Sequence, residues 1–346
     1  MVPPDGKPAP VGGFFETHDP DGATGGVSVM EAWTGDRAWA AFGNARSAFA
    51  ALVATLPGAT VWLPAFVCRD MVAPSFRERV RFYPVAEGFH PDLVGVEAGM
   101  AAGDLVLVVA YFGQPVAEGV RDLIRRRPDL HIVEDRAQAL APGPAVDGSW
   151  VLYSPRKLLG VADGGLLVAP VGRAMLPRPD TSPDGDALWR APQQRHDDPL
   201  GRNNAVWHVA NRGKEAAMAV TSEAMTERSL AVLSRTPLSS LVDPRLANWR
   251  LLDRALHHWS ALPADPTVPP LGYVLRLEPD ARDAVLKGLH AERIFAAVHW
   301  PEIAAPAGDF PRETQWTREL ITLPCDHRYG EAGMARIARR VEGLLA

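Results

Sequence analysis

Two residues whose types and spacing could support carbonyl chemistry stand close to the ends of short apolar runs. Lys157 is one of four lysines in a chain that carries thirty-two arginines. An arginine could supply the same charge, but only an amine can lose its proton and attack an aldehyde to form a Schiff base. Twenty-two residues earlier, the apolar run 131–135 ends in Asp135. A lysine and a carboxylate in this order predict a site for pyridoxal phosphate (PLP).

Each residue predicted to contact the cofactor ring has its own role. Lys157 would bind the aldehyde, and Asp135 would keep the ring nitrogen protonated so that the ring acts as an electron sink. Gln138, one helical turn beyond Asp135, could reach the ring hydroxyl from the same side. Asp135 alone could equally cap a helix at a strand-to-helix turn. The ordered set of three residues favours the cofactor site.

The segment 43–48, just before the first long predicted helix, could bind the cofactor phosphate. The amino end of a helix attracts anions through its free amides and its dipole. Ala45, Arg46 and Ser47 would supply amides, a guanidinium and a hydroxyl, and Ser154 is a second candidate donor. Asn44 or Ser47 could instead simply cap the helix.

The composition excludes several classes of protein. A length of 346 residues, 47% of them hydrophobic and 22% charged, suits one large domain and a smaller one. A net charge of -5 and a pI near 6.1 argue against nucleic acid as a partner. Two cysteines provide neither a disulfide framework nor a metal pattern. The start lacks the apolar core of a signal peptide and no run approaches a membrane span, so we expect a cytoplasmic protein.

Predicted strands and helices alternate through the first half of the chain. We expect strands at 59–63, 104–112, 131–135, 150–153 and 165–169, and helices at 46–56 and 118–127. Strands separated by helices imply parallel crossovers, so the fold class is α/β with a doubly wound sheet. Ligands bind at the carboxyl ends of such strands, where Asp135, Ser154 and Lys157 all fall.

We predict three parts of the chain. Residues 1–40 form an N-terminal arm with a short helix near 30–41, and residues 41–235 form a large PLP-binding α/β domain. Within the large domain, residues 176–235 make a long excursion that is helical near 205–232. Residues 236–346 form a small α+β domain, with helices at 243–259, 281–289 and 333–345 and strands at 272–277 and 294–298.

Three motifs resemble those of the DegT/DnrJ/StrS sugar aminotransferases. Residues 109–115 resemble that family's strand and Gly-Gln-Pro turn, 133–139 its Glu-Asp-x-Ala-Gln motif, and 154–165 its serine, lysine and Gly-Gly segment. The resemblance covers the chain from about residue 43 to the end and implies a PLP-dependent transferase of fold type I. That fold has a mostly parallel doubly wound sheet and a smaller C-terminal α+β domain. The C-terminal motifs suggest an atypical branch.

The resemblance also implies residues near the substrate. His299 and Trp300 would approach it, and we place Tyr111 of the first motif with them. The ordinary alternative is a tryptophan packed in the small domain and a hydrogen-bonded histidine.

The chain departs from the family at several positions. Cys68 stands where an aromatic residue often stacks on the ring, so Phe66 could serve instead. The spacing from Ser154 to Lys157 is two residues shorter than is usual, and Arg46 could carry a larger share of the phosphate charge. Family dimers borrow an asparagine from the neighbouring subunit, and residues 203–204 lie in a suitable stretch.

The resemblance implies a mechanism in which Lys157 holds PLP as an internal aldimine. An amino donor, glutamate by analogy, would leave pyridoxamine phosphate, and a keto sugar carried on a nucleotide would then receive the amino group. The active site would lie at the interface of a homodimer. Two alternatives remain: a dehydratase-like PLP enzyme, in which a histidine replaces the lysine, and a catalytically silent relative that serves as a partner subunit.

Overall fold

The large sheet of the protein has seven strands, and four of the pairings between neighbouring strands are parallel. A computed structural model describes residues 8–18, 25–173, 177–181, 185–263 and 267–346. The strand order is β4-β3-β7-β8-β9-β10-β2, and the last two pairings, of β10 with β9 and with β2, are antiparallel. The strands are β2 (Trp39–Phe42), β3 (Val61–Pro64), β4 (Val80–Tyr83), β7 (Leu105–Val109), β8 (His131–Asp135), β9 (Trp150–Tyr153) and β10 (Gly165–Val168). The predicted mostly parallel sheet is confirmed.

Helices cover both faces of this sheet. All five residues of β7 are buried, as expected for a strand covered on both faces. Leu105 and Leu107 pack in one core with residues of α2 (Ala45–Ala54), whereas Val106 and Val108 pack in another with residues of α3 (Glu118–Arg126). Alternate residues of one strand therefore serve two cores, which is the arrangement of a doubly wound sheet. The short helix α1 (Val29–Thr34) joins a third core beside β9 and β10.

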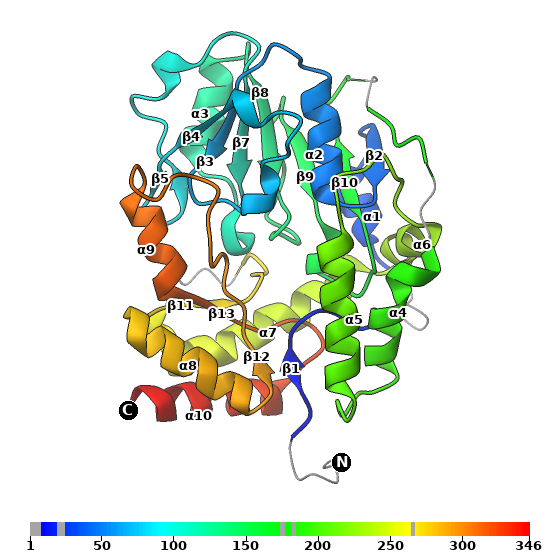
Figure 1. The fold of residues 1–346 in the computed structure, drawn as a ribbon, viewed down its shortest axis with the longest axis vertical. Helices are drawn as coiled ribbons and strands as arrows, with labels where there is room; N and C mark the ends of the chain where they lie inside the picture. Colours follow the sequence, from blue (N-terminus) through cyan, green and yellow to red (C-terminus); the bar gives the residue numbers. More distant parts are fainter. Residues whose placement is uncertain (1–7, 19–24, 174–176, 182–184, 264–266) are drawn as a thin grey trace.

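The C-terminal third has a core of its own around a two-stranded sheet. The antiparallel strands β11 (Tyr273–Arg276) and β13 (Leu320–Leu323) pack with three helices that lie together in Figure 1: α7 (Leu238–Leu256), α8 (Pro279–Ala291) and α10 (Glu331–Leu345). This part of the chain also contains α9 (Pro311–Glu319). A short hairpin, β5 (Val85–Ala86) with β6 (His90–Pro91), lies outside both sheets.

The N-terminal arm joins distant parts of the chain. Strand β1 (Val11–Gly12) pairs in parallel with β12 (Ile294–Phe295) of the C-terminal third. A few residues later, the backbone amide of His18 donates to the carbonyl of Gly160, 3.0 Å away, in the loop after Lys157. The arm thus connects the C-terminal third, where Figure 1 shows β1 close to β12, to the loop that carries the candidate catalytic lysine.

Three predictions of local structure need correction. The strand expected at 104–112 is β7, which ends at Val109, and Tyr111–Gly113 form a 3-10 turn. The helix expected near 30–41 ends at Thr34, and residues 39–42 form strand β2. Strand β2 has only a Trp-Ala-Ala-Phe sequence, and its conformation is set by pairing with the distant β10. The helix expected near 205–232 is two helices, α5 (Asn204–Ala217) and α6 (Glu227–Arg235), preceded by α4 (Gly185–His196). Part of the Pro-rich stretch before α4, like the first seven residues, lies outside the described residues.

In the described part of the chain, no helix has the length and apolar character needed to cross a bilayer. The same part contains no group of three His, Cys, Asp or Glu side chains that could hold a metal ion.

Candidate functional site

Lys157 lies just beyond the carboxyl end of β9, in a 3-10 turn formed by Pro155–Lys157. Its backbone amide donates to the carbonyl of Ser154 at 3.1 Å. The Lys157 amine forms no hydrogen bond or ion pair with any described residue, and the side chain lines a cavity of about 480 Å³. Ser154 is buried, and its hydroxyl also lacks a partner among the described residues. The amine is therefore available to a ligand in the cavity.

Asp135 is the last residue of β8, the strand next to β9. Its carboxylate is buried and accepts a hydrogen bond from the backbone amide of Ala137 at 2.9 Å. Burial raises the pKa of Asp135, and the positive charge of Lys157 acts in the opposite direction. The structure therefore brings the predicted acid and the predicted amine within electrostatic range at the carboxyl edge of the sheet.

The neighbours of Asp135 in β8 form a separate network. Glu134 and Arg136 make a fully buried ion pair of 2.7 Å. Glu134 also accepts hydrogen bonds from the amide of Val146 at 2.6 Å and from the hydroxyl of Ser149 at 2.8 Å. Because side chains alternate along a strand, this network occupies the opposite face from Asp135 and fixes the loop between β8 and β9.

Of the two polar atoms of the Gln138 side chain, only the oxygen has a hydrogen-bond partner among the described residues. Its Oε1 accepts a hydrogen bond of 2.8 Å from the amide of Phe112, which adopts a left-handed backbone conformation with φ 54°. Its Nε2 is buried and has no partner among the described residues. A buried donor without an acceptor is costly, so an acceptor from a ligand would stabilise this atom. An amide donor, a carboxylate and an amine are the groups that the ring hydroxyl, ring nitrogen and aldehyde of PLP require.

His299 and Cys68 lie within electrostatic range of Lys157. Burial and, as the smaller cause, the charge of Lys157 together lower the pKa of His299 to about 3, so the ring is neutral at pH 7. One ring nitrogen, Nδ1, lies 3.0 Å from the hydroxyl of Thr322. Burial raises the pKa of the Cys68 thiol, which lies at the start of the turn after β3. Both side chains therefore stand close to the candidate cofactor site in their uncharged forms.

Phe66, Tyr111 and Trp300 form an aromatic cluster behind the site. The ring centroid of Phe66 lies 5.3 Å from that of Trp300 and 5.7 Å from that of Tyr111. Phe66 and Tyr111 are fully buried, and the Tyr111 hydroxyl donates to the carbonyl of Phe66. None of the three rings lines the cavity of Lys157. Cys68 does not line that cavity either, but the charge of Lys157 acts on its thiol. We therefore retain Cys68, and not Phe66, as the candidate for contact with the cofactor ring.

The amino end of α2 is covered by the segment 218–221. Asn44 caps the helix by accepting from the amide of Ser47 at 2.9 Å, and the Ser47 hydroxyl accepts from the amide of Thr221 at 3.0 Å. Arg46 donates to the carboxylate of Asp70 and to the carbonyl of Met218, both at 2.8 Å. Asn44 thus caps the helix, which is the alternative role predicted for it. Arg46 is hydrogen-bonded to other residues of the protein at the helix end where the phosphate is predicted to bind.

Gly165, which begins β10, permits the close approach of this strand to α2. A Cβ atom at Gly165 would lie 2.2 Å from the backbone nitrogen of Ala45 and from the carbonyl carbon of Asn44. Only glycine can occupy this position without moving the backbone of the helix start. The Gly-Gly pair of the third motif therefore has a packing role beside the site.

The cavity of Lys157 is bounded by residues that the sequence did not indicate. The wall includes the N-terminal arm, helix α5 and the segment around β12. These lining residues include Phe14, Phe15, Arg156, Arg195, Trp207, His208, Asn211, Glu215, His290 and Phe295. The position of Arg156 directly before Lys157 was the one local signal available. The others reach the site only through long-range folding.

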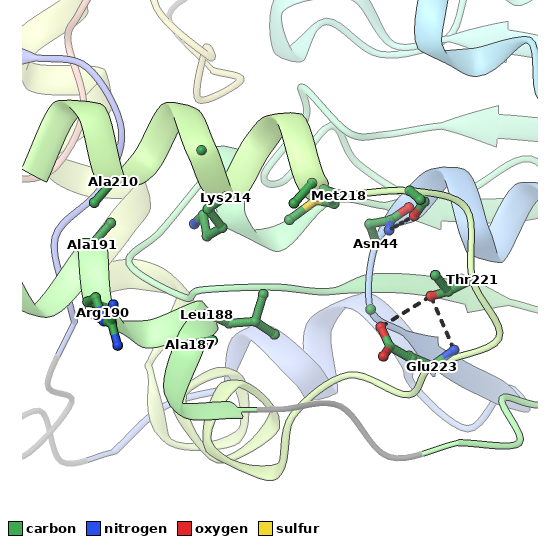
Figure 2. Close-up of a pocket in the computed structure, with 14 residues that line it drawn as sticks. Asn44, Ala187, Leu188, Arg190, Ala191, Ala210, Lys214, Met218, Thr221 and Glu223 are labelled. Atoms are coloured by element: carbon green, nitrogen blue, oxygen red, sulfur yellow. Dashed lines mark hydrogen bonds between the residues drawn. The ribbon is translucent and has the colours of Figure 1, made fainter.

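A second cavity of about 420 Å³ lies between α4 and α5 and extends to Asn44. Figure 2 shows Ala191 of α4 opposite Ala210 of α5, and Lys214 lies on α5 with Ala210. Lys157 does not line this cavity. The cavity containing Lys157 is therefore the candidate active site.

The architecture is that of the PLP-dependent aminotransferases of fold type I. The solved structures that the chain resembles include the sugar aminotransferase candidate Spr1654 of Streptococcus pneumoniae in its PMP form, with 14% identity, a TM-score of 0.65 and coverage of 100% of this chain and 99% of that one. A DegT DnrJ EryC1 StrS aminotransferase of Brucella abortus has 17% identity and a TM-score of 0.63, with 91% and 87% covered. PseC of Helicobacter pylori, an aminotransferase of pseudoaminic acid biosynthesis, has 15% identity and a TM-score of 0.61, with 93% and 91% covered.

These likenesses confirm the predicted fold class. No family profile matches the chain, and no curated protein is similar to it in sequence.

Proposed function

We propose that the protein is a PLP-dependent aminotransferase that moves an amino group from glutamate to a keto sugar carried on a nucleotide. One observation carries the proposal: the charge of Lys157, just beyond β9, acts on the buried carboxylate of Asp135 at the end of the neighbouring β8, and the unpaired amide nitrogen of Gln138 follows three residues later. The resemblance to structures that include a PMP form and an aminotransferase of pseudoaminic acid biosynthesis supports the cofactor and the sugar.

In this proposal the bound cofactor supplies an electron sink next to the carbon that carries the amino group. Lys157 would attach the cofactor through its amine and, once released, would move a proton at that carbon as base and then as acid. Asp135 would hold the proton on the ring nitrogen, and Gln138 would donate to the ring hydroxyl. Cys68 would pack against the ring, and the neutral His299 would lie beside the substrate.

The phosphate would bind at the first turn of α2. The amides of Ala45 and Arg46 and the hydroxyl of Ser47 stand at the positive end of the helix dipole. Ser154, whose hydroxyl lacks a partner among the described residues, is a second donor. Phosphate binding would then require the Ser47 hydroxyl to donate while it accepts from Thr221.

We further propose a homodimer with the active site at its interface. Helix α5, which lines the cavity of Lys157, carries Val206 and Val209 with exposed fractions of 57% and 59%. A second subunit would cover these side chains and would bring residues 203–204 toward the site. Light scattering coupled to size exclusion would give twice the chain mass of 37.4 kDa for the dimer.

The test of the function is the visible absorbance of the purified chain with PLP. A wild-type band that glutamate converts to a shorter wavelength, and that is absent from Lys157→Ala, is the expected result. Lys287→Ala is the matched control because Lys287 is exposed on α8 and does not line the cavity of Lys157. A band that survives in Lys157→Ala would contradict the role of this lysine, and a wild-type band that glutamate leaves unchanged would contradict the donor.

A panel of nucleotide-linked and free keto sugars then identifies the acceptor. The pyridoxamine form, prepared with glutamate, regains the original band only with a sugar that accepts the amino group. Recovery with free sugars alone would contradict the nucleotide linkage.

A further inference from the structure

Two arginines line the cavity of Lys157, and one of them is fully engaged. Each guanidinium nitrogen of Arg195 has a protein partner: Nε contacts Glu16 at 3.1 Å, and the other two nitrogens donate to the carbonyls of Phe14 and Gly12. Arg195 therefore holds the N-terminal arm in place and offers little to a ligand.

Arg156, the residue directly before Lys157, is engaged through only one nitrogen. Its Nη1 donates to both carboxylate oxygens of Glu215, at 2.6 and 2.7 Å. Its Nε is buried and has no partner among the described residues. A guanidinium can bind a carboxylate through two nitrogens at once, so the present pairing uses only part of its capacity.

Glu215 has a second cation close by. The amine of Lys214 lies 4.0 Å from Glu215 and donates to the carbonyl of Ala162 at 3.2 Å. If Arg156 turned to another carboxylate, Glu215 would keep an opposite charge within reach. The side chains of Arg156 and Glu215 are 17% and 36% exposed, so the pair is accessible from the cavity it lines.

We propose that Arg156 recognises a carboxylate of the amino donor, and that Glu215 occupies the guanidinium when no donor is bound. This inference rests on the proposed function for the identity of the donor. Amino transfer requires one cavity to receive first an amino acid with charged carboxylates and then a keto acceptor whose reacting end is uncharged. The Arg156–Glu215 pair meets both needs because it opens for the carboxylate and closes for the acceptor.

The physical basis is the cost of leaving a partly buried charge unpaired. With an uncharged substrate in the cavity, Arg156 without Glu215 would be a desolvated cation. With a carboxylate present, the exchange keeps Arg156 paired and allows its Nε–H, which has no partner among the described residues, to donate a hydrogen bond. Glu215 is thus a competitor of the donor, and removing its charge should strengthen carboxylate binding.

The experiment measures glutarate binding to the full-length protein by isothermal titration calorimetry, with and without PLP. Glutarate has the two carboxylates of the donor and no amine, and its neutral diamide serves as the comparison ligand. Arg156→Met should weaken glutarate binding by about tenfold to a hundredfold, the range for a charge-assisted hydrogen bond. Glu215→Gln should instead tighten it, by roughly threefold or more, within the range of a single competing contact.

The opposite changes in glutarate affinity expected for Arg156→Met and Glu215→Gln distinguish recognition of the carboxylate from a structural role of the ion pair. If the ion pair served only to position the turn of Lys157, both variants would weaken binding, and this result would overturn the proposal. The matched controls are Arg190→Met and Glu223→Gln, whose side chains line the second cavity and should leave glutarate binding unchanged. Binding of the diamide should be unaffected in every variant, and a parallel loss there would also overturn the proposal.

The calorimetry without PLP keeps this inference distinguishable from the proposed function. Absence of a glutamate-responsive band would refute the aminotransferase, whereas the carboxylate site is judged from the binding of glutarate and its diamide to the variants.

Discussion

His327 should make the protein sensitive to mild acid. The ring lies beside the guanidinium of Arg245, whose Nη2 is 3.3 Å from its Nδ1. Burial and then the charge of Arg245 lower the pKa of His327 to about 3, while Asp326 opposes this shift and Arg328 and His18 add to it. The folded protein therefore keeps this histidine neutral at pH values where an unfolded chain would protonate it.

The sign and size of the effect follow from the two pKa values. Since the pKa is lower in the folded state, stability is lost as the pH falls from about 6.5 toward 3. A pH of 5 lies about 1.5 units below the pKa of this histidine in the unfolded chain. At about 1.36 kcal/mol per unit, the free energy of unfolding falls by about 2 kcal/mol. Because pH 5 is still well above the folded value, the size of this loss depends on the unfolded pKa alone.

The assay is urea unfolding of the wild type and His327→Asn, followed by tryptophan fluorescence at pH 7 and pH 5 at fixed ionic strength. Asparagine can still accept a hydrogen bond from Arg245 but cannot take up a proton. The variant should lose about 2 kcal/mol less than the wild type between the two pH values. Other titrating groups, including His299, cancel in this difference. An equal loss in both proteins would refute the reasoning.

Three further outcomes are expected. Glu134→Gln should lower the free energy of unfolding by about 3 kcal/mol, because it leaves the buried Arg136 without its counter-charge. The control Glu118→Gln, at an exposed position, should change the free energy of unfolding little. Urea unfolding measures both variants, and equal effects would contradict the role of the network. Gly165→Ala should cost about 3 kcal/mol or more because its Cβ would clash with the α2 backbone, while Gly119→Ala, which meets no atom within 4 Å, should be neutral or stabilising in the same assay. Asp135→Asn should slow the glutamate-dependent change in absorbance by about tenfold to a hundredfold, since a neutral amide no longer stabilises a protonated ring nitrogen; an unchanged rate would remove Asp135 from the site.

The sequence was most informative where a strand is buried on both faces. The predicted strands 131–135 and 150–153 match β8 and β9 to the residue, because adjacent apolar residues, such as Ile132 and Val133, are typical of a strand that is buried on both faces. Strand β2 was missed because two of its four residues are alanines and its conformation depends on a partner more than a hundred residues away. Local propensity carries no information about such a pairing.

The same distinction applies to the site. Lys157 and Asp135 could be predicted because each lies at or just beyond the end of a predictable strand, and parallel strands place their carboxyl ends at one edge. The Arg156–Glu215 pair could not, since 59 residues separate its members and no local pattern shows where α5 folds back. Tyr111 illustrates a third case, in which a turn with a left-handed Phe112 directs the side chain into the core.

The N-terminal arm has a consequence for how the protein is made. The amide of Gly12 donates to the hydroxyl of Tyr329, and 317 residues separate the two. At about 5 to 20 residues per second, a ribosome would need roughly 15 to 60 s to deliver Tyr329 after Gly12 has been synthesised. The seven-stranded sheet is complete in the nascent chain well before that time. The wall formed by Phe14 and Phe15 is thus synthesised first and assembled last, so the cavity closes only after translation of the C-terminal third.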